Sequence, residues 1–170
     1  MIILQNKHYS PKHEEIYLFP GSFNPFHGGH LSICDRVRKE HNILPVLEIT
    51  RNNADKGEVP TSEIWNRLLN IESYNFPAIA TTTSIFADKI LHWAEKDKKQ
   101  TYIMGLDTWN RLNNPQYYPL DSLYDMIEKY EVSFLVFNRG YQEFVNPGIQ
   151  RVKYYHDFSD DTSSTKIRNQ

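Results

Sequence analysis

A short apolar run, Ile16–Phe19, leads into a turn that contains three glycines and two histidines, and the turn leads into a helical pattern. The turn reads GSFNPFHGGH, from Gly21 to His30. A strand that passes into a helix through a glycine-containing turn is typical of α/β proteins, which bind ligands at the carboxyl ends of their parallel strands. This junction therefore predicts a parallel sheet with a ligand site at the end of its first strand.

The rest of the chain repeats this alternation of strand and helix. The expected strands are Ile16–Phe19, Pro45–Ile49, Ile79–Thr82, Thr101–Met104, Val132–Phe137 and Val152–Tyr155. The expected helices are His30–Glu40, Ser62–Ser73, Ser84–Lys96 and Asp121–Lys129, with a last one near Ser164. The pattern predicts an α/β fold, a Rossmann-like doubly wound parallel sheet with helices on both faces. With 170 residues we expect one domain, residues 1–170, in which residues 1–15 form a peripheral N-terminal arm.

Composition argues against several classes of protein. The net charge of -2 gives no general electrostatic reason to bind nucleic acid. No apolar run approaches the roughly 18 residues of a membrane span, and the N-terminus lacks the roughly 7–15 apolar residues of a signal peptide. Cys34, the single cysteine, cannot form an internal disulfide. We expect a cytoplasmic protein, or a nuclear one, that binds neither nucleic acid nor membrane; the sequence leaves open whether it forms a homo-oligomer.

The turn after the first strand carries the strongest chemical signal. A helix N-terminus presents unsatisfied N–H groups and a partial positive charge, which favour a phosphate. His27 and His30 lie at that end, and their imidazole N–H groups can stabilise negative charge on a phosphoryl group. Gly28 and Gly29 let a ligand approach the backbone closely. The alternatives are that the two histidines cap the helix or bind a metal, although no third ligand lies within the turn.

A second hydroxyl-rich segment, SDDTSSTKIR, follows the last expected strand. Ser163, Ser164 and Thr165 suit both a helix N-cap and phosphate binding. Arg168 can bind phosphate oxygens through two N–H groups. An ordinary capped helix is the alternative for this segment taken alone.

A third segment, IMGLDTWNRLNNPQYY, begins at the end of the fourth expected strand. Gly105 allows close approach of a base or ribose, and Asp107 can accept hydrogen bonds from ribose hydroxyls. Asp107 is equally suited to be the N-cap of the helix that follows. Trp109, Tyr117 and Tyr118 can stack on a base, or they belong to the core and its rim.

The segment RNNADKGEVP follows the second expected strand. Lys56 beside Gly57, with Arg51 nearby, can bind the phosphate of a second substrate. The alternative is a surface loop with solvated charges.

GSFNPFHGGH resembles the (H/T)xGH signature of the nucleotidylyltransferase superfamily, and in particular the GSFxPxHxGH form of nicotinamide/nicotinate mononucleotide adenylyltransferases. The resemblance implies that His27 and His30 contact the triphosphate and stabilise the transition state. It also implies that Gly21, Ser22 and Phe23 approach the substrate through backbone groups.

SSTKIR is similar to the second signature of the same superfamily, ISSTxIR. Ser163, Ser164, Thr165 and Arg168 match its fixed positions. The resemblance implies that these residues hold the β- and γ-phosphates of the nucleotide, with Arg168 among the catalytic groups. Two signatures in the right order point to one function more strongly than either alone.

The resemblance extends less specifically to the other two segments. Gly105 and Asp107 match a GxD segment that contacts the nucleotide, and aromatics such as Trp109 are used near it. Arg51 and Lys56 correspond by position to the loop that binds the acceptor substrate, and we expect Trp109 to contact the acceptor as well.

The resemblance implies transfer of an adenylyl group from ATP to nicotinamide or nicotinate mononucleotide, with release of pyrophosphate. Mg²⁺ would arrive with the nucleotide, since this ion rarely needs a cage of protein ligands. A cytidylyltransferase and a pantetheine-phosphate adenylyltransferase share the histidine signature. A non-catalytic nucleotide-binding regulator is the alternative from another class, and an aminoacyl-tRNA synthetase-like fragment is disfavoured by length and charge.

Overall fold

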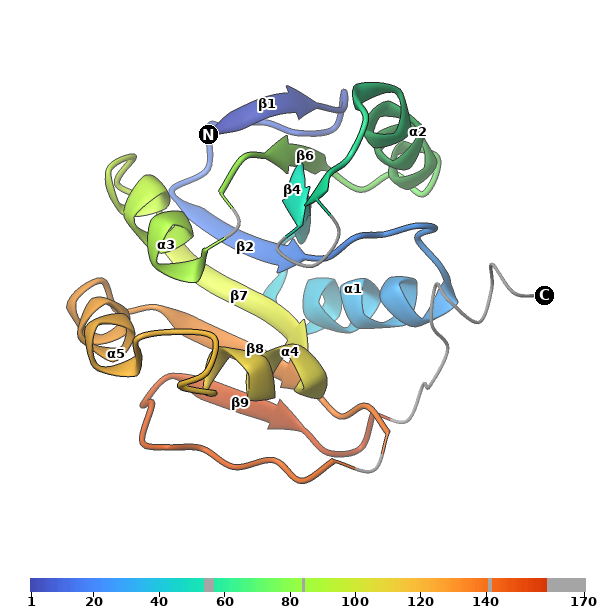
Figure 1. Cartoon of the computed structure of the whole chain (residues 1–170). Helices are drawn as coiled ribbons and strands as arrows, with labels where there is room; N and C mark the ends of the chain where they lie inside the picture. Colours follow the sequence, from blue (N-terminus) through green and yellow to red (C-terminus); the bar gives the residue numbers. More distant parts are fainter. Residues whose placement is uncertain (54–56, 84, 141, 159–170) are drawn as a thin grey trace. The chain divides into compact units, whose positions relative to one another are not determined.

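The computed structural model describes residues 1–53, 57–83, 85–140 and 142–158 of the chain (Figure 1). Over these residues, seven strands form one mostly parallel sheet, two short strands form a hairpin, and five helices connect them. The strands of the sheet are β1 (Ile2–Gln5), β2 (Glu15–Pro20), β3 (Val46–Thr50), β6 (Ala78–Thr81), β7 (Lys99–Gly105), β8 (Ser133–Phe137) and β9 (Val152–Tyr155). The hairpin consists of β4 (Asn52–Asn53) and β5 (Gly57–Glu58). The helices are α1 (Gly28–His41), α2 (Thr61–Glu72), α3 (Phe86–Ala94), α4 (Leu106–Leu112) and α5 (Leu120–Lys129).

The six expected strands and the first four expected helices are confirmed, with ends within two residues of the predicted ones. The helix expected near Ser164 lies outside the described residues. Three elements were not predicted: β1, the β4–β5 hairpin and α4. Each is short, from two to seven residues, so none shows enough periods of an apolar pattern to be recognised.

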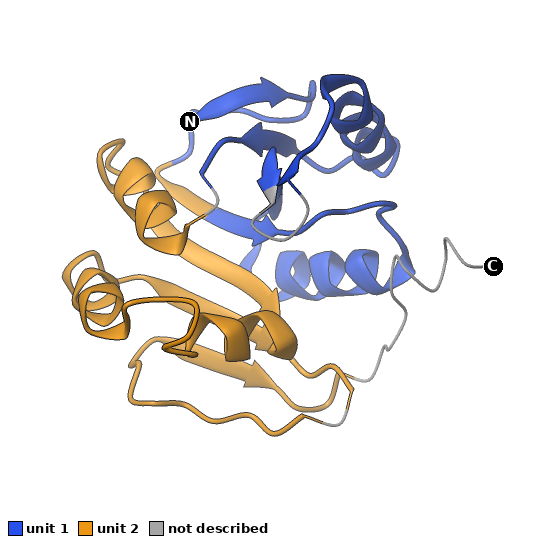
Figure 2. Cartoon of the chain, in the orientation of Figure 1, with its two compact units in different colours: residues 1–13, 17–84, 162–170 blue, residues 14–16, 85–161 orange. Residues whose placement is uncertain are grey.

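The chain divides into two compact units (Figure 2). Unit 1 contains residues 1–13, 17–84 and 162–170, and unit 2 contains residues 14–16 and 85–161.

Unit 1 contains the part of the sheet with strand order β1-β6-β3-β2. β3 lies parallel to both neighbours, so that Leu47 pairs with Phe19 on one side and with Ala78 on the other. β1, which was not expected to be a strand, runs antiparallel to β6 at the edge of the sheet. The apolar stripe of α2, consisting of Ile64, Leu68 and Ile71, is fully buried. The periodic apolar pattern therefore became the core of this unit, as amphipathic helices require.

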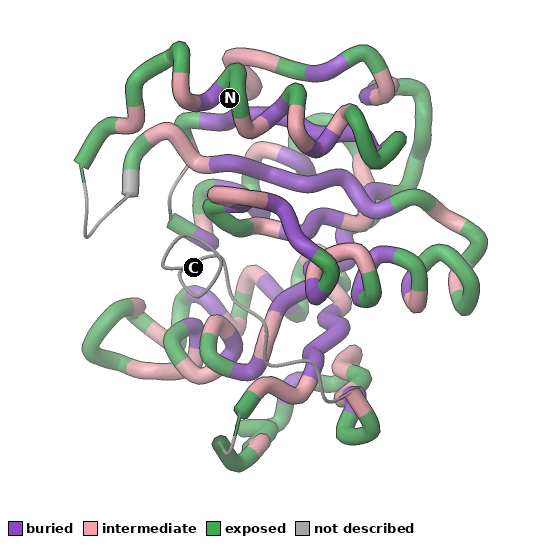
Figure 3. The backbone as a smooth tube through the Cα atoms, turned by 90° about the vertical axis from the view of Figure 1, so that its right-hand side faces the viewer, coloured by how far each residue is buried: buried purple, intermediate pink, exposed green. Residues whose placement is uncertain are grey.

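Unit 2 contains the three parallel strands β7, β8 and β9 in that order. The helices α3 and α4 pack against β7, and α3 also contacts α5. Large aromatic side chains fill the core of the unit, with Trp93, Tyr102, Trp109 and Phe134 all buried. Figure 3 shows how the buried residues follow the strands and the inner sides of the helices. No helix of the described residues is both long and apolar enough to cross a membrane.

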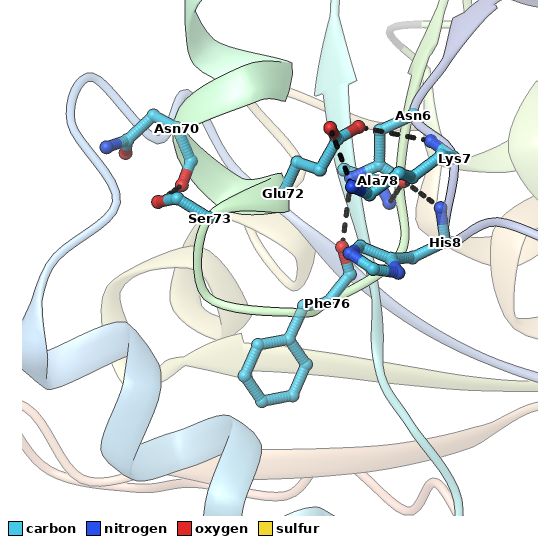
Figure 4. Close-up of polar contacts among 8 residues, drawn as sticks. All are labelled: Asn6, Lys7, His8, Asn70, Glu72, Ser73, Phe76 and Ala78. Carbon is cyan, nitrogen blue, oxygen red and sulfur yellow. Dashed lines mark hydrogen bonds and ion pairs between the residues drawn. The ribbon is translucent and has the colours of Figure 1, made fainter.

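The expected N-terminal arm is attached to the sheet by a buried asparagine (Figure 4). Asn6 Nδ2 donates a hydrogen bond of 2.9 Å to the carbonyl of Phe76, and its Oδ1 accepts from the N–H of Ala78 at 3.0 Å. The same oxygen accepts from the N–H of His8 at 3.2 Å. The side chain thus continues the pairing of β1 with β6 beyond the end of the strand.

We predict that Asn6→Ala lowers the free energy of unfolding by about 1–3 kcal/mol, because it leaves buried backbone groups without their partner. Urea unfolding followed by circular dichroism measures the change. Asn66→Ala, at an exposed position on α2, is the matched control and should change this energy by less than about 0.5 kcal/mol. Equal effects of the two substitutions would contradict the assigned role of Asn6.

Candidate functional site

The turn between β2 and α1 is held close to the sheet at its start. The N–H of Gly21 donates to the carbonyl of Glu48 at 3.0 Å, which extends the pairing of β2 with β3 by one residue. Phe23 has a left-handed φ of 44° and is buried. A Cβ on Gly21 would lie 2.9 Å from Cζ of Phe23. Because Gly21 has no Cβ, the Phe23 ring can occupy this space.

The two histidines of the turn cap α1 reciprocally. His27 is the N-cap, with extended backbone, and its Nδ1 accepts a hydrogen bond from the N–H of Gly29 at 3.1 Å. His30 Nδ1 accepts from the N–H of His27 at 3.2 Å. The first N–H groups of a helix have no partners within the helix, so these bonds stabilise the start of α1. The capping alternative from the sequence is confirmed.

These bonds also determine which nitrogen of each ring carries the proton. A nitrogen that accepts a hydrogen bond has no proton, so in the neutral rings of His27 and His30 the proton is on Nε2. The donor nitrogen of each ring is therefore Nε2, and an N–H donor suits a phosphate oxygen rather than a metal ion. Nε2 of His27 is buried in this structure. Among the residues that the structure describes, no group of three His, Cys, Asp or Glu side chains could hold a metal. The geometry supports a site for anions.

Aromatic rings surround the histidine pair. The rings of His27 and His30 stack with centroids 3.6 Å apart. Phe26 stacks on His30 at 5.4 Å, and Phe23 meets it edge-on at 4.9 Å. Phe26 in turn contacts Tyr74, which follows α2, at 4.9 Å. His27 is buried and His30 half-buried, so packing as well as hydrogen bonding restricts both rings.

An arginine that the sequence did not single out also holds the turn. Arg67 on α2 donates from Nη1 to the carbonyl of Ser22 at 3.2 Å and pairs with Glu63 one helical turn earlier. The N–H of Gly21 and the carbonyl of Ser22 are thus bound within the protein, so these two groups serve the fold. Sequence offers no local signal for Arg67, because its partner is 45 residues away.

The other predicted residues of unit 1 are placed as follows. Arg51 Nη2 forms an ion pair of 2.7 Å with Glu58 of the β4–β5 hairpin. The N–H of Val59 donates to the carbonyl of Arg51 at 2.9 Å, so the two described ends of the segment, residues 51–53 and 57–60, lie side by side. Outside the described residues lie Lys56, Ser163, Ser164, Thr165 and Arg168.

Three predicted residues lie in unit 2. Gly105 is the N-cap of α4, and a Cβ there would lie 2.8 Å from Oδ1 of Asp107. Asp107 is exposed in the first turn of α4, so the alternative that it is the N-cap is wrong. Trp109 is fully buried, and its Nε1–H donates to the carbonyl of Val145 at 3.0 Å. Trp109 therefore belongs to the core, which corrects its assignment to the acceptor site.

The cysteine of α1 is not a reactive group. Burial raises the pKa of the Cys34 thiol far above its usual range, and the Asp35 carboxylate adds to this effect. The thiol is therefore protonated at neutral pH and does not act as a nucleophile.

We predict that Gly28→Ala leaves the free energy of unfolding unchanged or raises it by up to about 1 kcal/mol, because a Cβ there meets nothing within 4 Å. The same Cβ enters the open space before the helix N-terminus and should weaken the binding of inorganic triphosphate about tenfold, or about 1.4 kcal/mol. Calorimetric titration measures the affinity.

Gly21→Ala is the contrasting variant, since its Cβ displaces the ring of Phe23 and should lower the free energy of unfolding by about 1–3 kcal/mol. If Gly28→Ala binds triphosphate as the wild type does, the start of α1 is not an anion site.

Comparison with known proteins places the chain in a family. The profile of the cytidylyltransferase-like family matches residues 18–170. A Schizosaccharomyces pombe protein, provisionally named a nicotinamide mononucleotide adenylyltransferase, is 30% identical over 124 residues, which cover 68% of this chain and 49% of that protein. A Streptococcus pneumoniae protein, provisionally named a nicotinate-nucleotide adenylyltransferase, is 28% identical over 130 residues, which cover 69% of this chain and 61% of that protein.

The match to this chain thus spans about half to three fifths of these relatives. A solved structure of Plasmodium falciparum nicotinic acid mononucleotide adenylyltransferase, complexed with APC, aligns with a TM-score of 0.50 and 15% identity. The alignment covers 92% of this chain and 83% of that one, so the two share a Rossmann-like fold. The family profile covers nearly the whole chain, from Leu18 in β2 onward. The chain therefore belongs to the cytidylyltransferase-like family.

Proposed function

We propose that the chain transfers an adenylyl group from ATP to nicotinamide or nicotinate mononucleotide and releases pyrophosphate. The reciprocal cap of His27 and His30 carries the proposal, because it orients both imidazoles at a helix N-terminus with Nε2 as their donor nitrogen. The names of the relatives from Schizosaccharomyces pombe and Streptococcus pneumoniae support this choice of acceptor.

The reaction is a direct displacement at the α-phosphorus. A phosphate oxygen of the acceptor forms the new bond as the bond to the pyrophosphate group breaks, and negative charge grows on the leaving oxygens. The Nε2–H groups of His27 and His30 donate to phosphate oxygens and stabilise this charge. Because the rings are oriented before the substrate binds, little reorganisation is needed. Positioning and charge stabilisation suffice for this class of reaction, so no covalent nucleophile is required.

A Mg²⁺ ion that arrived with the nucleotide would neutralise part of the charge of the triphosphate. With Nδ1 bound to the backbone and the proton on Nε2, His27 and His30 would donate to phosphate oxygens rather than bind the ion.

The remaining residues of the proposed site act on other parts of the substrates. Arg168, with Ser163, Ser164 and Thr165, holds the β- and γ-phosphates. Gly105 and Asp107 contact the nucleotide, and the exposed carboxylate of Asp107 accepts from ribose hydroxyls. Arg51 and Lys56 bind the acceptor phosphate.

Pyrophosphate release tests the proposal, with ATP or CTP paired in turn with nicotinamide or nicotinate mononucleotide. We expect release with ATP only, together with formation of the dinucleotide. Release with CTP only would make the chain a cytidylyltransferase. ATP binding without release for either acceptor would leave two candidates, a non-catalytic nucleotide-binding protein and transfer to another acceptor such as pantetheine phosphate.

We predict that His27→Asn lowers kcat about 10²–10³-fold while the melting temperature stays unchanged. Asparagine is a good N-cap, so its Oδ1 replaces Nδ1 as acceptor for the N–H of Gly29 and α1 keeps its cap. What is lost is the donor at the position of Nε2.

His27→Ala is the comparison, because it should lose the same activity and about 1 kcal/mol of stability as well. His30→Ala should also reduce kcat by orders of magnitude. If His27→Asn turns over at the wild-type rate, His27 only caps the helix.

A further prediction concerns the ion pair of Arg51 with Glu58, in which both side chains are partly exposed. Arg51→Ala should raise the KM for the acceptor with kcat unchanged, because a contact made equally in the ground and transition states is lost. Glu58→Gln should lower this KM by about two- to fivefold, because it frees the guanidinium. Initial rates at saturating ATP measure both, and identical KM values in the two variants would show that Arg51 only holds the hairpin.

A further inference from the structure

Arg67 connects α2 with the turn that carries the two histidines. Its Nη1 donates to the carbonyl of Ser22, and its Nη2 pairs with Glu63 on the same helix. The side chain of Arg67 is only 11% exposed. One guanidinium thus bridges two segments that are 45 residues apart in the sequence.

The ion pair of Arg38 with Asp35 on α1 is a useful contrast. That pair, at 3.1 Å, joins residues three positions apart on one helix, and the Arg38 side chain is 56% exposed. Exposed pairs of this kind contribute little to stability. Arg67 differs because it is nearly buried and because its second partner is a backbone carbonyl in another segment.

The guanidinium of Arg67 is not optimal for stability alone. Its Nε is buried and has no hydrogen-bond partner among the described residues. A buried N–H group without an acceptor destabilises the folded state. An apolar side chain at this position would avoid this penalty, but it could not donate a hydrogen bond to the carbonyl of Ser22.

The carbonyl of Ser22 is next in the chain to Phe23, whose ring packs against His30. Ser22 precedes Phe23, whose left-handed φ of 44° turns the chain and whose buried ring lies 4.9 Å from that of His30. On the other side, the N–H of Gly21 is bound to the carbonyl of Glu48 on β3. The turn is thus held from β3 on one side and from α2 on the other.

We propose that Arg67 is a positioning residue that holds the turn at Ser22 and thereby places the rings of His27 and His30 for catalysis. We assign it no contact with the substrate, because its side chain is nearly buried and each outer nitrogen already donates to a group of the protein. The catalytic part of this inference rests on the proposed function.

The experiment compares Arg67→Ala and Arg67→Lys with Arg38→Ala, the control, whose ion pair is exposed and lies within one helix. Long-range proton–nitrogen spectra of the imidazole rings, recorded on the full chain without ligand, report the position and tautomer of each histidine. For Arg67→Ala we expect shifted signals for His27 and His30, and a kcat about 10²-fold lower with a smaller change in the KM for ATP. Added guanidinium ion should restore part of kcat, and Arg38→Ala should match the wild type in kcat and in the imidazole signals.

Each outcome decides one of the two proposals. Imidazole signals of Arg67→Ala that coincide with those of the wild type would overturn the positioning role, as would an unchanged kcat. If the wild type releases no pyrophosphate but Arg67→Ala still shifts the imidazole signals, the proposed function fails and the positioning of the rings stands. If Arg67→Ala does not fold, Arg67→Lys and Glu63→Gln carry the same comparison, and unchanged signals in both would again overturn the role.

Discussion

The first turn of α1 has backbone N–H groups that the helix cannot satisfy, and the imidazoles of His27 and His30 accept two of them. This pair of hydrogen bonds starts the helix, selects the tautomer of both rings and stacks the rings on each other. The same two side chains therefore contribute to folding through Nδ1 and to the proposed chemistry through Nε2. Substitution of either histidine changes both, unless the new side chain keeps the acceptor and removes only the donor.

The cap depends on a layer of contacts from the rest of unit 1. β3 holds the turn through the backbone of Gly21, and α2 holds it through the guanidinium of Arg67. The rings of Phe23 and Phe26 enclose His30. Oriented donors of this kind stabilise developing charge without reorganisation at the moment of reaction, which is what the proposed adenylyl transfer requires. The rigidity of the turn is thus part of the proposed mechanism.

The local patterns of the sequence predicted most of the fold. Long apolar runs and amphipathic periods located six strands and four helices, because each such element buries its own side chains and so carries its own pattern. β1 was taken as part of an arm because its few apolar residues look the same in a loop and in an edge strand. The seven residues of α4 are too few to show a helical period, so Asp107 was considered as an N-cap although the helix begins before it.

The sequence by itself determined the family and the identity of the two histidines, because the motif GSFNPFHGGH places them at a strand-to-helix turn within one short segment. Tertiary structure alone decided which nitrogen of each ring is the donor, since this depends on atomic hydrogen bonds. It also decided that Trp109 belongs to the core and that Arg67 supports the turn. Trp109 and Arg67 each bond to a residue that is distant in the chain. A local sequence pattern does not show which distant residues come into contact when the chain folds.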